Sequence, residues 1–187
     1  MSQLRDPDLH ALLMLAAVTG ARRAQLLGLR WRNVNLDTAR VSFCAGWVEG
    51  LDGPVLAAAT KTKRAHMVPL DPTSFNVRLE RHQQLGASAT ADGFVVSDDD
   101  GATAWKPNRV TKAFLRHRRA ASLRQFRLHD LRHFMGTEML QAGVPIVVVS
   151  RRLDHRRVST TLDRYAHAVP GGDAAASAKL SNIIQSA

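Results

Sequence analysis

Cysteine is almost missing from this chain of 187 residues, which contains only Cys44. A single cysteine excludes an internal disulfide framework and a cysteine-rich zinc site. Long apolar runs are missing too, since the longest near the N-terminus, residues 11–18, is too short to span a bilayer. That run has neither a basic leader nor a cleavage site, so no signal peptide is evident. We therefore expect a soluble protein in a reducing compartment, the cytoplasm.

Acidic residues are scarce beside basic ones. The chain has 16 Asp and Glu against 26 Lys and Arg, which gives a formal net charge of +10. A positive charge of this size favours an anionic partner, with nucleic acid first and an anionic membrane surface second. Apolar residues make up 45% of the chain and charged residues 22%, so a real core can form and general disorder is excluded. We expect one domain of ordinary size, with or without a small appendage.

The basic residues are concentrated in one segment, residues 106–132. Its members are Lys106, Arg109, Lys112, Arg116, Arg118, Arg119, Arg124, Arg127 and Arg132. The segment has one acid, Asp130, so it lacks the interleaved acids that pair an ordinary solvated helix face. We favour a surface that follows phosphates over a solvated face. The predicted DNA-binding residues are Lys63, Arg64, Lys106, Arg109, Lys112, Arg116 and Arg127.

Periodicity and turn signals predict a mixed fold, mainly α-helical, with a small antiparallel β-sheet. Helices are expected at residues 6–19, from 22 onwards, and at 72–84, 107–119, 131–142, 145–153, 160–166 and 174–184. Strands are expected at 41–43, 55–58 and 66–70, with a short strand or turn at 94–97. Residues 45–54 are expected to be a glycine-containing connection and residues 60–64 a basic turn. Thr160 and Thr161 are expected to cap the helix that ends near residue 166.

A set of ionisable residues, placed at helix starts, at turns or at helical spacing, points to chemistry on phosphate. Its members are Arg22, Lys61, His129, Arg132, His155 and Tyr165. Arginine forks match the nonbridging oxygens of a phosphate, and histidine and lysine move protons near neutral pH. A tyrosine hydroxyl can form a covalent phosphodiester, and Tyr165 is the only tyrosine in the chain.

Each of these residues also has a plainer interpretation. Arg22 and His155 fit ordinary surface positions, Lys61 fits a solvated basic turn, and Tyr165 fits a core aromatic with its hydroxyl at the rim. His129 fits a helix cap, and Arg132 fits an ion pair with Asp130 or Glu138. Spacing alone does not decide between the two interpretations. The joint occurrence of all six residues, in this order, favours a phosphoryl-transfer site without a metal.

Four segments resemble motifs of the tyrosine recombinases, also called the phage integrase family. Residues 19–26, with Thr-Gly-Ala-Arg, look like the first arginine box, and residues 60–70 are similar to the β-hairpin lysine segment. Residues 128–133, Leu-His-Asp-Leu-Arg-His, look like the His-x-x-Arg box. Residues 153–155 and 159–167 resemble the closing box that carries the nucleophile. The resemblance runs from about residue 9 to residue 167 and implies the tyrosine recombinase (DNA breaking-rejoining) catalytic-domain fold.

The resemblance implies a role for each of the six residues. Tyr165 would attack the scissile phosphodiester and hold the 3′ end of the DNA, while Arg22 and Arg132 would grip the nonbridging oxygens. Lys61 would protonate the leaving 5′ oxygen, His129 would assist proton transfer at the tyrosine, and His155 would hydrogen-bond the phosphate. No metal, ATP or other cofactor is implied. The implied partners are double-stranded DNA, further copies of the chain in a homotetramer on synapsed DNA (a monomer when free), and an accessory directionality protein, with no membrane.

The chain departs from the family pattern at several positions. Gln25 stands where glutamate is usual, Asp154 where glycine is common, and His66 where arginine is frequent. Phe134, Met135, Gly136 and Thr137 replace the usual run of small residues. We expect a catalytic domain at residues 1–169 and a tail at 170–187 whose short helix docks on a neighbouring protomer, docks on its own domain or stays disordered. The family's N-terminal core-binding domain is expected to be absent from this chain.

Three other functions stay open on the sequence. A type IB topoisomerase-like nicking-closing enzyme uses similar chemistry, but the closing box favours a recombinase. A non-catalytic DNA-binding module is disfavoured because all six site residues are present. A basic membrane-surface protein is disfavoured because no basic amphipathic helix with bulky aromatics is visible.

Overall fold

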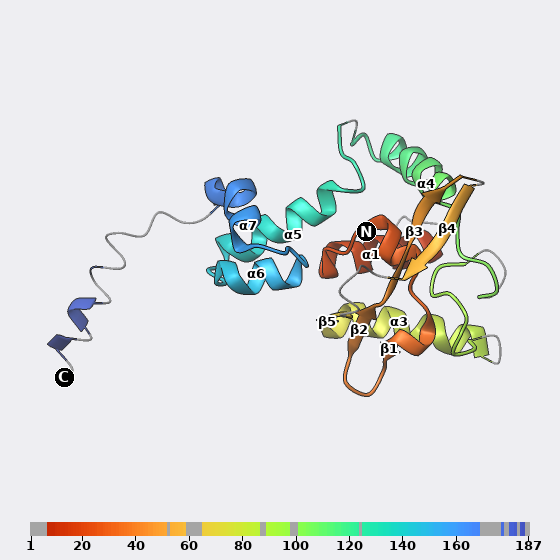
Figure 1. Ribbon diagram of the computed structural model, residues 1–187, viewed down its shortest axis with the longest axis horizontal. Coiled ribbons are helices and arrows are strands. Elements are labelled where there is room, and N and C mark those ends of the chain that lie inside the picture. The colour runs from red at the N-terminus through yellow and green to blue at the C-terminus, as the bar shows by residue number, and fades with distance from the viewer. Residues whose placement is uncertain are drawn as a thin grey trace.

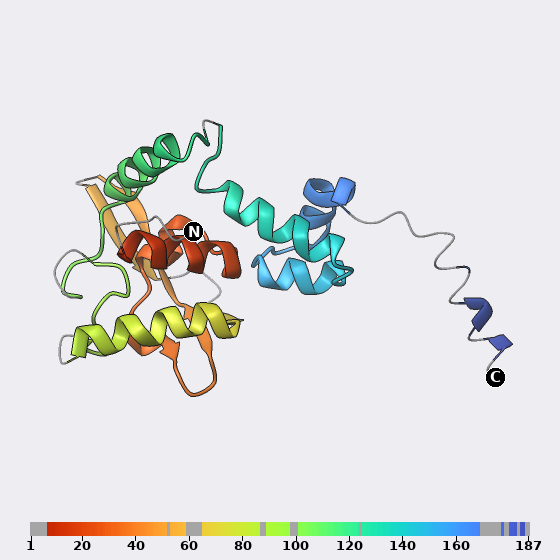
Figure 2. The same cartoon turned by 180° about the vertical axis from the view of Figure 1, so that it is seen from behind.

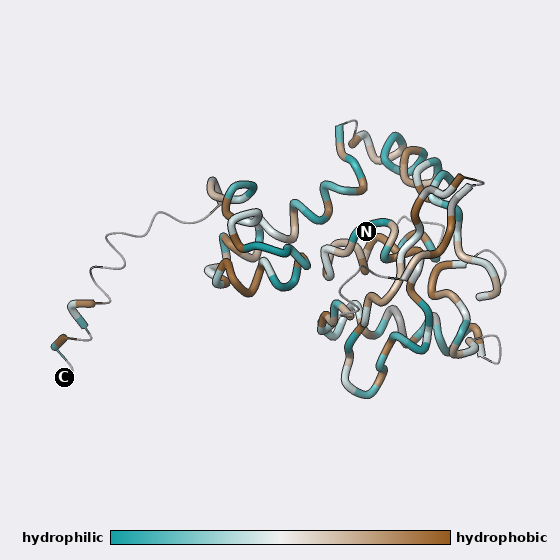
Figure 3. The backbone as a smooth tube through the Cα atoms, viewed as in Figure 1, coloured by the Kyte–Doolittle hydropathy of each residue, from teal (hydrophilic) through white to brown (hydrophobic). Residues whose placement is uncertain are grey.

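The computed structural model describes residues 7–51, 53–58, 65–86, 89–97, 101–123 and 125–168, and a few residues of the tail, 177, 180–182, 184 and 185. Figure 1 shows two lobes, a larger one that holds the strands and the helices α1 to α4, and a smaller one that holds α5 to α7. Each lobe has its own cluster of buried apolar side chains, and hydrophobic stretches run through both (Figure 3). The predicted class, mainly helical with antiparallel strands, is confirmed.

The first helix, α1 (Pro7–Thr19), confirms its predicted bounds within a residue. Proline in the first turn and Asp8 beside it suit a helix start, and the apolar positions, such as Leu9 and Leu12, are fully buried. The helix stops at Gly20, whose φ of 64° favours glycine. A Cβ at this position would also lie 2.2 Å from the Met135 side chain of the other lobe. Gly20 therefore lets the chain turn into α2 (Arg23–Leu27) close against the smaller lobe.

The strands form two antiparallel sheets where the sequence predicts one. Strands β1 (Val34–Asn35), β2 (Arg40–Phe43) and β5 (His66–Pro69) pair in the order β1-β2-β5. Strands β3 (Ala45–Gly50) and β4 (Gly53–Ala58) pair as a separate hairpin. The prediction of a mere connection at residues 45–54 is therefore wrong. Its glycines hide the strand signal, although one of them, Gly46, packs against the backbone of α2.

Two long helices flank the strands of the larger lobe. Helix α3 (Pro72–Leu85) begins at Asp71, whose carboxylate accepts a hydrogen bond from the Ser74 N–H at 3.1 Å, and it packs against α1 (Figure 2). Helix α4 (Pro107–Ala120) buries Val110, Ala113 and Phe114. Its residues Arg109, Lys112, Arg116 and Arg119 are exposed, whereas the partly buried Arg118 donates to the carbonyl oxygen of Phe126 at 3.1 Å. Between these helices, the predicted strand or turn at residues 94–97 makes isolated bridges to Arg30 and Ala104. A short 3-10 helix, η1 (Trp31–Asn33), precedes β1.

The smaller lobe contains α5 (Asp130–Gln141), α6 (Ile146–Arg152), α7 (Val158–Tyr165) and the 3-10 turn η3 (Ala166–Ala168). The predicted start of α7 is wrong. The helix begins at Val158, after Arg157, and Thr161 lies inside it, fully buried. The Thr161 hydroxyl is committed to a histidine ring and does not cap the helix. The predicted turn at 60–64 and most of the predicted helix at 174–184 lie outside the described residues.

The lobes meet through α1 and α5 and through polar contacts of α6. The Arg152 guanidinium donates to the carbonyl oxygen of Val18 at 2.8 and 3.1 Å and to that of Pro69 at 3.2 Å. The His66 ring lies 3.1 Å from the carbonyl oxygen of Arg151. Along the described parts of the chain, no helix combines the length and apolar character needed to cross a bilayer.

Candidate active site

Arg132 lies at the centre of the candidate site, on the first turns of α5 and 4% exposed. Its guanidinium donates hydrogen bonds to the carbonyl oxygens of Gly20 and Leu153. One side chain therefore joins the loop after α1, the start of α5 and the end of α6. Burial, followed by the charge of Arg22, lowers the Arg132 pKa to about 10, so the side chain stays charged at neutral pH.

The plainer interpretation of Arg132 as the partner of Asp130 is wrong. The Asp130 carboxylate accepts from the backbone N–H of Arg127 at 2.7 Å and lies 3.3 Å from the Arg127 guanidinium. The carbonyl contacts of Arg132 use Nη1 and Nη2, one hydrogen bond from each end of the guanidinium.

Arg22 reaches the same region from the loop before α2. Its Nη1 lies 3.7 Å from a carboxylate oxygen of Asp154, and each side chain is nearly half exposed. Asp154 adopts a φ of 52°, the left-handed region that suits the glycine expected there. The side-chain oxygen of Gln25 accepts a hydrogen bond from the Arg22 backbone N–H at 2.9 Å.

His155 follows α6 and faces the arginines. Its Nδ1 lies 2.7 Å from the Thr161 hydroxyl, so a buried residue of α7 fixes the ring. Burial, followed by the charges of Arg132 and Arg22, lowers the His155 pKa from the ordinary 6.5 to about 4. The ring is therefore neutral at physiological pH.

Tyr165 ends α7 and is 1% exposed, within the apolar cluster of the smaller lobe. A Cβ at Gly136 would lie 2.8 Å from the phenol carbon Cζ, so only glycine leaves room for this ring. The hydroxyl lies 3.2 Å from Nδ1 of His133. Burial raises the tyrosine pKa, and the charges of Arg132 and Arg164 oppose that rise.

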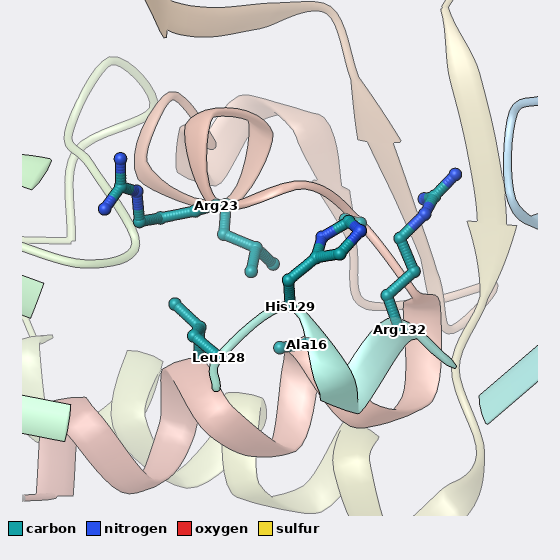
Figure 4. A pocket seen from close by; sticks show the side chains of 7 residues that line it. Ala16, Arg23, Leu128, His129 and Arg132 are labelled. Carbon is teal, nitrogen blue, oxygen red and sulfur yellow. The ribbon is translucent and has the colours of Figure 1, made fainter. Parts of the chain in front are cut away.

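His129 lies immediately before α5, exposed, and makes no side-chain cap bond to the helix. It borders a hollow of about 270 Å³ (Figure 4). The other lining residues are Ala16, Ala21, Arg23, Leu26, Leu128 and Arg132. Figure 4 shows Arg23 pointing away from His129 and Arg132, and its guanidinium donates to the Thr111 hydroxyl at 2.7 Å. Burial, followed by the charge of His133, lowers the pKa of His129.

Sequence reasoning missed His133, Thr161 and Gly136. His133 directly follows Arg132 and lies four residues after His129, so helical spacing could have placed it on the His129 face. The rings of His129 and His133 do meet, edge to face, with centroids 4.8 Å apart. The contacts of Thr161 and Gly136 depend on how α5 and α7 pack, which no local signal encodes.

The predicted DNA-binding residues divide into three groups. Lys106, Arg109, Lys112 and Arg116 of the α4 region line one hollow of about 480 Å³, and the Arg109 guanidinium also lies 4.3 Å from the centre of the Trp105 ring. Arg127 is instead paired with Asp130. Lys63, Arg64 and the predicted catalytic Lys61 lie outside the described residues.

Comparison with known proteins decides the family. Residues 3–170 match the model of the phage integrase family. The chain belongs to that family. It is 28% identical to a tyrosine recombinase XerC-like protein of Caldanaerobacter subterraneus subsp. tengcongensis, over 89% of this chain and 47% of the relative. It is 25% identical to the integrase of Salmonella phage P22, over 91% of this chain and 41% of the relative.

Solved structures agree on the fold. The Tn1549 transposon integrase in complex with transposon right end DNA superimposes with a TM-score of 0.73 at 13% identity, over 95% of this chain and 59% of that one. The catalytic domain of bacteriophage HP1 integrase gives 0.59 at 22% identity, over 95% and 84%. The family fold is therefore that of the tyrosine recombinase catalytic domain. This chain spans about half the length of the curated relatives that it matches.

Proposed function

We propose that this chain, with residues 1–169 as its catalytic domain, is the catalytic part of a site-specific DNA recombinase. It cuts and rejoins DNA through a covalent 3′-phosphotyrosyl intermediate, without metal or ATP. The observation that carries the proposal is the Arg132 fork, which holds three separate segments together. In these segments Arg22, His155 and Tyr165 lie close enough to Arg132 for their charges to interact. The charge of Arg22 lowers the pKa of Arg132, and the charge of Arg132 lowers the pKa of His155 and opposes the rise in the pKa of Tyr165.

In the proposed reaction each group acts in the protonation state that it has in the free protein. The Tyr165 oxygen attacks phosphorus as its proton passes to a histidine of the 128–133 segment, the bond to the 5′ oxygen breaks, and Lys61 supplies the proton that the leaving oxygen needs. Arg22 and Arg132 neutralise the charge that develops on the nonbridging oxygens. With Thr161 donating to Nδ1, the neutral His155 ring carries its proton on Nε2, and this N–H donates a hydrogen bond to the phosphate.

DNA is the proposed partner because of charge and shape together. The net charge is +10, and four basic residues of the α4 region line one hollow. The proposed assembly on synapsed DNA is a homotetramer, with a monomer in the free state and an accessory protein for direction. Residues 170–187 are the proposed tail that joins neighbouring protomers.

The decisive experiment is covalent capture on a nicked suicide duplex. The duplex carries a candidate attachment site taken from the genomic sequence that flanks the gene, and denaturing gels report a protein–DNA adduct. We expect an adduct from the wild-type chain and none from Tyr165→Phe, which removes only the hydroxyl of the single tyrosine. DNA binding should survive in this variant, and folding should change by about 1 kcal/mol at most. An adduct from the Phe variant would refute the mechanism.

A further inference from the structure

We infer that His133 is a catalytic residue of this chain, the acceptor of the proton that Tyr165 loses when its oxygen attacks DNA. The inference rests on the proposed function. It differs from the assignment suggested by sequence, which gives assistance at the tyrosine to His129. The structure instead places Nδ1 of His133 3.2 Å from the tyrosine hydroxyl, within hydrogen-bond distance.

The contact is built by the backbone as well as by the two side chains. His133 and Gly136 lie on adjacent turns of α5, and Gly136 opens the space that the phenol fills. A Cβ there would come within 3.1 Å of the tyrosine oxygen, so α5 fixes both the slot and the acceptor. The His129 ring lies edge to face against the His133 ring, so His129 reaches the tyrosine through His133.

Burial and the charges around His133 keep its ring neutral, the form that can accept a proton. Burial, followed by the charge of Arg164 on α7, lowers its pKa from the ordinary 6.5. Arg132 on α5 and Arg127 before it act in the same direction, and Asp130 opposes them. A neutral imidazole with its proton on Nε2 presents the lone pair of Nδ1 to the Tyr165 O–H.

The tyrosine needs such an acceptor because burial raises its own pKa, so it does not ionise unaided at neutral pH. In the step that we infer, the bond from the tyrosine oxygen to phosphorus forms as the O–H bond breaks and the proton moves to Nδ1 of His133. The bond from phosphorus to the 5′ oxygen breaks, and Lys61 protonates the leaving oxygen. In the reverse step, a free 5′ hydroxyl attacks and the imidazolium returns its proton to the tyrosine.

The test is the single-turnover rate of adduct formation by the whole chain on the suicide duplex, measured from pH 5.5 to 9. His133→Asn keeps an acceptor near the position of Nδ1 but cannot take up a proton. We expect its rate at pH 7 to fall about 10²-fold or more, a typical value for general base catalysis. The loss should shrink as pH rises, because hydroxide then replaces the missing base. His129→Asn, one turn before His133, is the matched control and should lose less.

A second duplex with sulfur in place of the leaving 5′ oxygen separates acid from base. A thiolate leaves without a proton, so this duplex rescues the loss of an acid and not the loss of a base. His133→Asn should stay slow on it. Rescue by the sulfur duplex would make His133 an acid, and an unchanged rate for His133→Asn would remove it from the chemistry, so either result overturns the inference. DNA binding and melting temperature confirm that the variant folds. No adduct from wild type would refute the proposed function itself.

Discussion

Asp154 places a negative charge beside Arg22, an arginine that the proposed reaction needs to bind phosphate. Its carboxylate lies 3.7 Å from the Arg22 guanidinium, and the pair is nearly half exposed. Such a pair contributes only about 0–1 kcal/mol, so an incoming phosphate can displace it. The left-handed backbone of Asp154, with a φ of 52°, adds a cost of about 1 kcal/mol that glycine would avoid. We therefore expect Asp154 to destabilise the turn and to lower the affinity for DNA.

Removing this carboxylate should tighten DNA binding. Asp154→Asn keeps a residue that tolerates the left-handed region and removes only the charge, whereas Asp154→Gly also removes the strain. We expect both variants to bind duplex DNA several-fold more tightly at low salt, and only the glycine variant to gain about 1 kcal/mol in the free energy of unfolding. Fluorescence anisotropy and urea unfolding measure the two effects. Binding by Asp154→Asn that equals wild type would contradict the competition between carboxylate and phosphate.

The neutral His155 ring predicts a loss of stability in mild acid. Its folded pKa is about 4 and its ordinary value 6.5, so between these pH values the unfolded chain binds more protons than the folded one. The free energy of unfolding should fall as pH drops from 6.5 towards 4, by at most about 1.4 kcal/mol per pH unit for this one group. Below pH 4 its contribution changes no further.

His155→Gln removes this titration, so urea unfolding across the same pH range should give it a shallower slope than wild type. Some slope should remain, because burial also lowers the pKa values of His66, His129 and His133. Identical slopes for the variant and wild type would show that His155 takes up its proton equally in both states.

Most residues of the candidate site could be predicted from the sequence, because they lie in short segments with recognisable motifs. The supporting contacts are not visible. The carbonyl partners of Arg132, on Gly20 and Leu153, are 112 and 21 positions away in the chain. The residue type of Thr161 predicts a helix cap, yet tertiary packing buries this side chain against His155. A hydroxyl can serve either use, and only the fold decides between them.

Helix α4 illustrates what sequence can do at the level of an element. Proline near its start and the apolar positions Val110, Ala113 and Phe114 predict its bounds closely. Strand β3 shows the opposite case, since its pairing with β4 comes from the hairpin and not from intrinsic preference. Periodicity is a strong signal in a long amphipathic helix and a weak one in a short strand that contains glycine.

The basic face of α4 should supply part of the salt dependence of DNA binding. Lys112 and Arg116 lie one turn apart and line the same hollow. We expect Lys112→Ala and Arg116→Ala each to reduce the slope of log K against log salt by about 0.9, the value for one lost phosphate contact.

The control for α4 is Arg40→Ala. This change also removes one exposed positive charge, but from β2, which lies at the other end of the larger lobe (Figure 1). The slope for Arg40→Ala should stay at the wild-type value. Equal slopes for all three variants would mean that net charge, and not the α4 face, determines the affinity.

The whole molecule places its candidate site at the junction of two lobes with separate cores. Arg132 and Arg152 donate hydrogen bonds to backbone carbonyls of the larger lobe, and Leu131 of α5 packs against the apolar core of that lobe. Polar contacts across a junction are exchangeable with water or phosphate more readily than a packed core is. We therefore expect the hydrogen bonds at the junction to rearrange before its apolar contacts do when a DNA phosphate reaches the arginines.

We expect an apolar surface of the smaller lobe to contact a second copy of the chain. Val147 and Val148 on α6 and Leu162 on α7 are 43 to 49% exposed, and Leu180 and Ile184 of the tail are 59% and 74% exposed. The apolar tail of one protomer can pack against the apolar face of another, which removes both surfaces from water. We expect deletion of the residues after Pro170 to abolish multimers on DNA with paired sites and to spare binding as a monomer. Native gels and light scattering distinguish the two species.

Point variants separate the apolar contact from the length of the tail. Leu180→Ser with Ile184→Ser should reproduce the deletion, because these changes remove the apolar groups that would dock. Ser181→Ala with Gln185→Ala changes neighbouring exposed residues and removes only their mutual hydrogen bond of 3.2 Å, so assembly should be unchanged. A truncated chain that assembles as well as wild type would count against exchange between protomers, and docking within the same chain would then explain the exposed face of α6 and α7.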